Sequence, residues 1–192
     1  KIEIKKISHN NNITIIPHGI KVNNINFFKK KNKKIKFVFY SRIHPIKGLY
    51  ELVKNWSQSN KLKNIKLDIY GQIENKEYFA KVQKYFGKNI NYLGSIKSKD
   101  KYKILKNYDV LVFPSLSENF GMVILECLNC GLFIIIRRGL PWNFLSPRFA
   151  KFIEFNQHSL EKNVLLISKS KKLSSHKNQL RLYLQKNFNI DN

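Results

Sequence analysis

Short apolar segments alternate with amphipathic helical segments along almost the whole chain, and this alternation constrains the fold more than any other feature. Strands buried on both faces are nearly continuous apolar runs, whereas an apolar residue every three or four positions is typical of a helix. The pattern predicts strands at 12–17, 34–41, 65–71, 90–94, 108–114 and 132–136, and helices at 49–60, 75–87, 98–107, 121–131, 159–170 and 174–188. Such an alternation predicts an α/β fold, with a parallel sheet that helices cover on both faces.

The loop that follows the expected strand at 34–41 carries two cations, Arg42 and Lys47. In a parallel sheet, ligands bind beyond the carboxyl ends of the strands, in the loops that open the next helices. The helix here is expected to begin near Gly48, and its unpaired N–H groups and dipole add to the charge of the two side chains. The loop therefore predicts a diphosphate site, although the spacing alone also fits two solvated basic residues.

The loop PSLSENFG and the helix expected after it contain two carboxylates, Glu118 and Glu126. Gly121, near the start of that helix, lets the backbone approach a ligand closely. Glu126 lies in a strongly apolar helical run, where a carboxylate is costly unless a partner satisfies it. The expected partner of Glu126 is a ligand or one of the many lysines. Glu118 is expected to contact the same ligand or, alternatively, to cap the helix.

The net charge of +24 comes from 36 basic and 12 acidic residues, and it permits two interpretations. Only five of the basic residues are arginines, whereas proteins that bind phosphates or base edges favour arginine for its bidentate geometry. Lysine is enriched together with Asn, Ile, Tyr and Phe, as an A/T-rich coding sequence would produce. We prefer this interpretation, and attraction to an anionic membrane surface or to nucleic acid is the alternative.

Cys127 and Cys130 form a C-x-x-C pair inside the expected helix at 121–131. A zinc site would need further ligands at suitable spacing, and a redox motif would open a helix instead of lying late in one. We interpret the pair as small buried residues with reduced thiols. No apolar run approaches ~18 residues and no signal-peptide pattern follows Lys1. A cytoplasmic location is therefore expected, with peripheral contact at the inner face of an anionic membrane.

The chain resembles the C-terminal, donor-binding half of a retaining glycosyltransferase of the GT-B type, in the large family 4 (glycosyl transferases group 1). The matching segments are IIPHGI, SRIHPIKGL, LDIYG, NYLG, DVLVFPSLSENFGMVILECLNCGLFII and RRGLPW, and they lie between Ile13 and about Phe188. The most specific segment is the E-x7-E element from Glu118 to Glu126, followed by R-x4-K-G from Arg42 to Gly48. The resemblance implies a Rossmann-like parallel sheet with helices on both faces.

The resemblance also implies roles for individual residues. Glu126 would accept hydrogen bonds from the ribose of a nucleoside-diphosphate sugar, and Glu118 would reach the hydroxyls of the donor sugar. Arg42 and Lys47 would hold the diphosphate and stabilise it as the leaving group, a role that a metal plays elsewhere. The implied catalytic residues are thus Glu118, Arg42 and Lys47, and the donor would also contact the chain around Asn119, Phe120, Gly121 and Met122. No metal and no cofactor is expected, because the nucleotide sugar is a substrate.

The implied reaction moves a sugar to a hydroxyl acceptor with retention, and the acceptor binds mainly to a second, N-terminal domain. The expected division is a connector from that missing domain at 1–34, a nucleotide-sugar-binding domain at 35–188 and a truncated tail at 189–192. The expected partners are therefore the nucleotide sugar and the missing acceptor domain. The isolated chain is expected to be inactive.

Two segments depart from the family pattern. RRGLPW, from Arg137 to Trp142, stands where the family often has G-G-x-x-E. A similar G-x-P-W occurs in members that build bacterial polysaccharides, so surface polysaccharide or lipopolysaccharide synthesis is the expected setting. SPRFAKFIEF, residues 146–155, fits poorly and receives no interpretation.

Two rival functions stay open. One is a non-catalytic basic module for nucleic acid or anionic membrane, which would need lysines clustered on one face and exposed aromatic residues. The other is a GT-B enzyme that uses another phosphorylated donor, such as a phosphorylase or synthase. We expect no specific nucleic-acid partner, and we expect His18 and His44 to be solvated or to structure loops.

Overall fold

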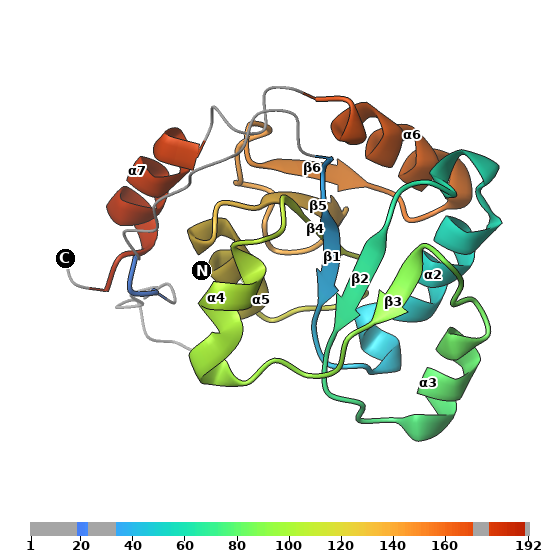
Figure 1. Ribbon diagram of the computed structural model, residues 1–192. Helices are drawn as coiled ribbons and strands as arrows, with labels where there is room; N and C mark the ends of the chain where they lie inside the picture. The colour runs from blue at the N-terminus through green and yellow to red at the C-terminus, as the bar shows by residue number, and fades with distance from the viewer. Residues whose placement is uncertain (1–18, 23–33, 171–176, 191–192) are drawn as a thin grey trace, which may run out of the picture.

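The computed structural model describes residues 19–22, 34–170 and 177–190 (Figure 1). The strands are β1 (Phe37–Tyr40), β2 (Leu67–Tyr70), β3 (Ile90–Tyr92), β4 (Val110–Phe113), β5 (Phe133–Arg137) and β6 (Ala150–Ile153). The helices are α2 (Leu49–Gln58), α3 (Lys76–Gln83), α4 (Lys101–Leu105), α5 (Met122–Asn129), α6 (Gln157–Ser168) and α7 (Lys177–Phe188). Three short 3-10 helices join them: η1 (Pro45–Lys47), η2 (Asn60–Leu62) and η3 (Ser98–Asp100).

The strands form one six-stranded sheet in the order β3-β2-β1-β4-β5-β6, and every neighbouring pair is parallel. From β1 the chain builds the sheet outward through β2 and β3. It then returns to the other side of β1, where β4 begins the second half. In a sheet of this order, the crevice beyond the carboxyl ends of the two central strands is the usual ligand site.

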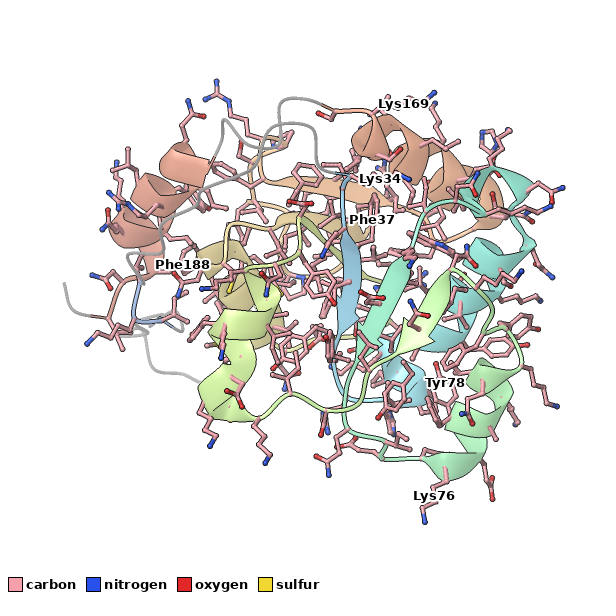
Figure 2. All side chains as sticks on the ribbon, viewed as in Figure 1. Lys34, Phe37, Lys76, Tyr78, Lys169 and Phe188 are labelled. Atoms are coloured by element: carbon pink, nitrogen blue, oxygen red, sulfur yellow. The ribbon has the colours of Figure 1, made fainter. Side chains whose placement is uncertain are left out.

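Alternate residues of each strand pack on opposite faces of the sheet, because strand side chains have a period of two. In β1, Phe37 and Phe39 face a cluster that includes α2, α3 and α6, whereas Val38 faces a cluster that includes α4, α5 and α7. Figure 1 shows these two groups of helices on either side of the sheet. In Figure 2, Lys76 and Lys169 lie at the periphery of the molecule, whereas Phe37 lies within it.

The predicted α/β, Rossmann-like parallel sheet with helices on both faces is confirmed. One strand was missed. Residues 146–155, for which the sequence offered no interpretation, contain β6, which pairs with β5 at the edge of the sheet. Only four residues pair, and of these only Ala150 and Ile153 are buried, so the apolar pattern is too short to stand out.

The expected strand at 12–17 and most of the expected connector at 1–34 lie outside the described residues. The described part of the connector packs against the end of the chain. The N–H of Ile20 donates to the carbonyl of Phe188 at 2.8 Å, and the N–H of Ile190 donates to the carbonyl of Ile20 at 3.3 Å. Asn129 of α5 also donates to the carbonyl of Lys21 at 2.9 Å. The division of the chain into connector, domain and tail stays a prediction.

Candidate functional site

A cavity of about 760 Å³ lies beyond the carboxyl ends of β1 to β4, at the centre of the sheet. Its wall is made by the loops that follow these four strands and by the first turns of α5. Every site residue predicted from the sequence lines it: Arg42, Lys47, Glu118, Asn119, Phe120, Gly121, Met122 and Glu126. The fold therefore brings the two predicted motifs together at one place, and the roles assigned to them stay predictions.

Lys47 and Glu118 form an ion pair across the cavity wall. The Nζ of Lys47 lies 2.6 Å from Oε1 of Glu118, and the two side chains are 11% and 9% exposed. Lys47 ends η1, whose first turn is held by the Nδ1 of His44, which accepts from the N–H of Ile46 at 3.3 Å. His44 thus structures the loop, as expected, whereas His18 lies outside the described residues.

Glu118 does not cap helix α5, so the alternative interpretation of this residue as a helix cap is wrong. The helix begins after Gly121, which has a left-handed backbone with φ 77° and makes no side-chain cap. The carboxylate of Glu118 turns instead to the loop after β1. At the start of α5 the first backbone N–H groups have no intrahelical acceptor, and they form the positive end of the helix dipole.

The loops after β1 and β4 are also joined through their backbones. The N–H of Leu116 donates to the carbonyl of Ile46 at 2.8 Å, and the hydroxyl of Ser115 donates to the same carbonyl at 3.3 Å. Gly48 has a φ of +69°, and a Cβ added to it would lie 2.3 Å from the carbonyl oxygen of Pro114. This close approach explains the glycine, since any side chain would push the two loops apart.

Glu126 is paired with Lys101, a residue that the sequence did not single out. The Nζ of Lys101, at the start of α4, lies 2.6 Å from Oε1 of Glu126. The alternative of an ion pair with a lysine therefore describes Glu126 in this structure. Burial raises the pKa of the Tyr40 phenol on the cavity wall, and the negative charge of Glu126 raises it further.

Arg42 lies on the cavity wall with 61% of its side chain exposed. Its Nη1 donates to both carboxylate oxygens of Glu74, at 3.0 and 3.1 Å. Glu74 follows β2 and was also not identified from the sequence. An exposed pair of this kind is worth about 0–1 kcal/mol, so an anionic ligand can readily compete with Glu74 for the guanidinium.

The cavity can bind a ligand that combines hydroxyl groups with an anionic centre. Glu118 and Glu126 offer acceptor oxygens for hydroxyls, while Arg42, Lys47 and the start of α5 offer donors and positive charge for an anion. No cluster of three or more His, Cys, Asp or Glu able to hold a metal ion occurs in residues 19–22, 34–170 and 177–190.

Cys127 and Cys130 are both buried thiols, as expected, and burial raises the pKa of Cys127 well above its ordinary value.

The helices described by the structure include none with the length and apolar character needed to cross a membrane.

Similar solved structures share the fold. A mutant of TarM from S. aureus, solved with fondaparinux, α-GlcNAc-glycerol and UDP, is 19% identical with a TM-score of 0.76, over 99% of this chain and 39% of that one. Sucrose-phosphate synthase from Thermosynechococcus elongatus is 18% identical with a TM-score of 0.77, over 98% of this chain and 51% of that one. The chain thus spans only about two fifths to a half of these proteins.

A third structure has nearly the same extent as this chain. It is the C-terminal domain of the glycosyl transferase group 1 family protein LpcC from Francisella tularensis, which is 18% identical with a TM-score of 0.67. The match covers 85% of this chain and 96% of that domain. A comparison with curated proteins gave no match. The family model for glycosyl transferases group 1 matches residues 21–142, more than half of the sequence, and the chain therefore belongs to this family.

Proposed function

We propose that this chain is the donor-binding half of a retaining glycosyltransferase, which moves a sugar from a nucleoside-diphosphate sugar to a hydroxyl acceptor. The observation that carries the proposal is the central cavity, where both glutamates of the E-x7-E element and both cations of R-x4-K-G meet at the start of α5. Family membership supports glycosyl transfer, and the UDP bound to S. aureus TarM supports a nucleotide ligand. That the reaction retains the configuration of the sugar, and that the enzyme belongs to family 4, is proposed from the resemblance of the E-x7-E element.

The ion pair of Lys47 with Glu118 fits this proposal. An ammonium group has three donors, so Lys47 can hold Glu118 and still donate to a phosphate oxygen. Arg42 has further N–H groups beyond the Nη1 that donates to Glu74. Together with the dipole of α5, these groups supply the charge that stabilises a departing diphosphate. We therefore propose that the diphosphate is bound without a divalent metal.

In this proposal the two glutamates bind different parts of the ligand. Glu126 lies within α5 and would accept from the ribose hydroxyls, beside Lys101. Glu118 lies in the loop before α5, and would accept from hydroxyls of the transferred sugar. A hydroxyl can donate to an oxygen of a carboxylate that already accepts from lysine, because each carboxylate has about four lone-pair sites.

The chain spans about two fifths to a half of the TarM and sucrose-phosphate synthase structures. We propose that an N-terminal acceptor domain completes the cleft. The G-L-P-W sequence after β5 suggests synthesis of surface polysaccharide or lipopolysaccharide. The proposed location is the cytoplasm, with the lysine-rich surface in peripheral contact with the anionic inner face of a membrane.

The rival role as a basic binding module needs exposed aromatic residues beside the lysines. Among the large hydrophobic side chains that are exposed in the described part of the chain, Phe144 is the one aromatic. The other aromatic side chains of the strands and helices contribute mainly to the two cores, with Phe37 and Trp56 in one core and Phe113 in the other. This placement favours the enzyme over the module.

Calorimetric titration of the chain with UDP, GDP and ADP, and with their glucose conjugates, tests the proposal in the presence and absence of EDTA. A hydrogen bond to a charged group is worth about 1.5–3 kcal/mol, so Glu126→Ala should weaken a diphosphate and its sugar conjugate alike, by about 10- to 150-fold. Glu118→Ala should weaken only the sugar conjugate. It should leave the bare diphosphate unchanged or bound more tightly, since Lys47 loses its partner.

Glu77→Ala on α3 is the matched control, because this exposed carboxylate does not line the cavity. It should change neither affinity. Loss of binding in EDTA would contradict metal-independent binding. Equal losses for both ligands in both site variants, or no loss in either, would contradict the assignment of the two glutamates.

A further inference from the structure

The loop after β5 reaches back to the loop that carries Glu118, and this contact has no counterpart in the predicted motifs. Arg137, the last residue of β5, donates through Nε to the carbonyl of Pro114 at 2.9 Å. Its Nη2 binds the carboxylate of Glu51 on α2, and its guanidinium lies 5.1 Å from the ring of Phe155. Arg137 thus has three partners, Pro114, Glu51 and Phe155. These contacts hold its guanidinium in place, so the Nε–H is a fixed donor to the carbonyl of Pro114.

Trp142 holds the other end of the loop that carries Glu118, at Phe120. Its side chain is fully buried, and its indole N–H donates to the carbonyl of Phe120. The ring centroids of Phe120 and Trp142 also lie 5.2 Å apart. Because the carbonyl and the next N–H point in opposite directions across a trans peptide, this bond turns the N–H of Gly121 away from Trp142.

We propose that Arg137 and Trp142 are positioning residues that hold the loop from Pro114 to Phe120 in the shape that binds the donor sugar. This inference rests on the proposed function. Glycine is conformationally permissive, so the backbone at Gly121 does not fix the end of the loop by itself. The indole N–H supplies that restraint at Phe120, and the guanidinium supplies it at Pro114. A loop already held in its binding shape loses less conformational entropy on binding, which increases affinity.

The position of the two restraints makes the effect selective. Glu118 lies between them in the loop, and the proposal assigns Glu118 to the sugar. Glu126 is carried by α5, and Lys47 by η1, so both are fixed mainly by their own helical turns. Loss of a restraint should therefore weaken the sugar conjugate more than the bare diphosphate.

The chain contains a matched control for Trp142. Trp56 is equally buried, and its indole N–H also donates to a backbone carbonyl, that of Ile65, at 3.2 Å. It lies in the core on the other side of the sheet, with α2, α3 and α6. Trp142→Phe and Trp56→Phe each remove one buried indole N–H and leave an aromatic ring, so both lower thermal stability. Only Trp142→Phe changes a contact of the loop that carries Glu118.

The experiment is titration of the wild-type chain and both variants with UDP, GDP and ADP and their glucose conjugates, beside thermal melts. Loss of one hydrogen bond predicts that Trp142→Phe weakens the sugar conjugate by about 3- to 10-fold. The bare diphosphate should be weakened less than the sugar conjugate, because Arg42 and Lys47 keep their supports and only the Gly121 N–H at the start of α5 loses a restraint. Trp56→Phe should keep both affinities. Arg137→Lys, which keeps the charge beside Glu51 but loses the Nε donor, should behave as Trp142→Phe does, with exposed Arg138→Lys as its control.

The outcomes separate this inference from the proposed function. If the wild-type chain binds none of these ligands, the proposed function fails. If it binds them and both Trp142→Phe and Arg137→Lys discriminate sugar conjugate from bare diphosphate as the wild type does, the positioning role is refuted. A loss of the same size in Trp56→Phe would also refute it, because general destabilisation would then explain the result.

Discussion

Gly48→Ala is the change that most directly tests how the two halves of the site are joined. Gly48 has a φ of +69°, and the Cβ of an alanine would lie 2.3 Å from the carbonyl oxygen of Pro114 and 3.0 Å from its carbonyl carbon. The affected atoms are backbone, so no side chain can swing away to make room. The variant must therefore move one loop relative to the other.

Two costs add in this variant. A left-handed backbone costs an alanine about 1–2 kcal/mol. Ordinary contact begins at 3.4 Å, so an atom at 2.3 Å must be displaced by roughly 1 Å. Overpacking of this kind typically costs about 1–3 kcal/mol. The free energy of unfolding should thus fall by about 2–5 kcal/mol, a large part of the about 5–15 kcal/mol that stabilises a typical domain.

Gly94→Ala is the control that carries the backbone cost alone, so the difference between the two variants gives the cost of the contact with Pro114. Gly94 has a φ of +85°, and a Cβ added there would meet no atom within 4 Å. The control should lose only the backbone cost of about 1–2 kcal/mol. Urea denaturation followed by tryptophan fluorescence measures both variants, and an unchanged m-value shows that the comparison is sound. If the two variants lose the same stability within about 0.5 kcal/mol, the contact between Gly48 and Pro114 does not constrain the loops.

Two further predictions concern charge. Lys61 and Ser59 donate to the carboxylate of Glu161 and hold its pKa below the ordinary value of 4.5. These contacts therefore stabilise the folded state above pH 4.5. The stabilisation is lost as the pH falls through the lowered pKa of Glu161 in the folded state. Glu161→Gln should therefore flatten the acid side of the pH profile of thermal stability, and an unchanged profile would contradict the pairing. With a net charge of +24, the chain should bind duplex DNA weakly, without sequence preference, and almost not at all by a few hundred millimolar salt. Fluorescence anisotropy measures this, and nanomolar, sequence-selective binding at physiological salt would instead favour the nucleic-acid module.

The sequence predicts the fold well because local pattern and global topology agree. Nearly continuous apolar strands and amphipathic helices alternate regularly from β1 to β5, and each expected element between 34 and 136 has a counterpart in the structure. β6 escaped prediction because it is only four residues long and follows a segment rich in turns. The pairing of edge strands depends on space left by the rest of the sheet, which local pattern does not encode.

Site residues were predictable where motif spacing fixes them, and their partners were not. Nothing local to Glu126 distinguishes Lys101 from the many other lysines, because the contact depends on how α4 lies beside α5. The same holds for Arg42 and Glu74, which follow neighbouring strands. Arg137 and Trp142 were visible as a departure from the family pattern. Their acceptors are backbone carbonyls, which carry no sequence signal.

The pairing of acids and bases around the cavity has a kinetic consequence. Arg42, Lys47 and Lys101 each face a carboxylate, so the site itself is close to neutral within a chain of net charge +24. A diphosphate far from the protein therefore senses mainly the excess positive charge of the rest of the chain, and this charge raises its encounter rate. Salt screens that long-range attraction, whereas contacts shorter than a Debye length are screened much less. Ionic strength should accordingly slow association and leave the lifetime of the complex nearly unchanged.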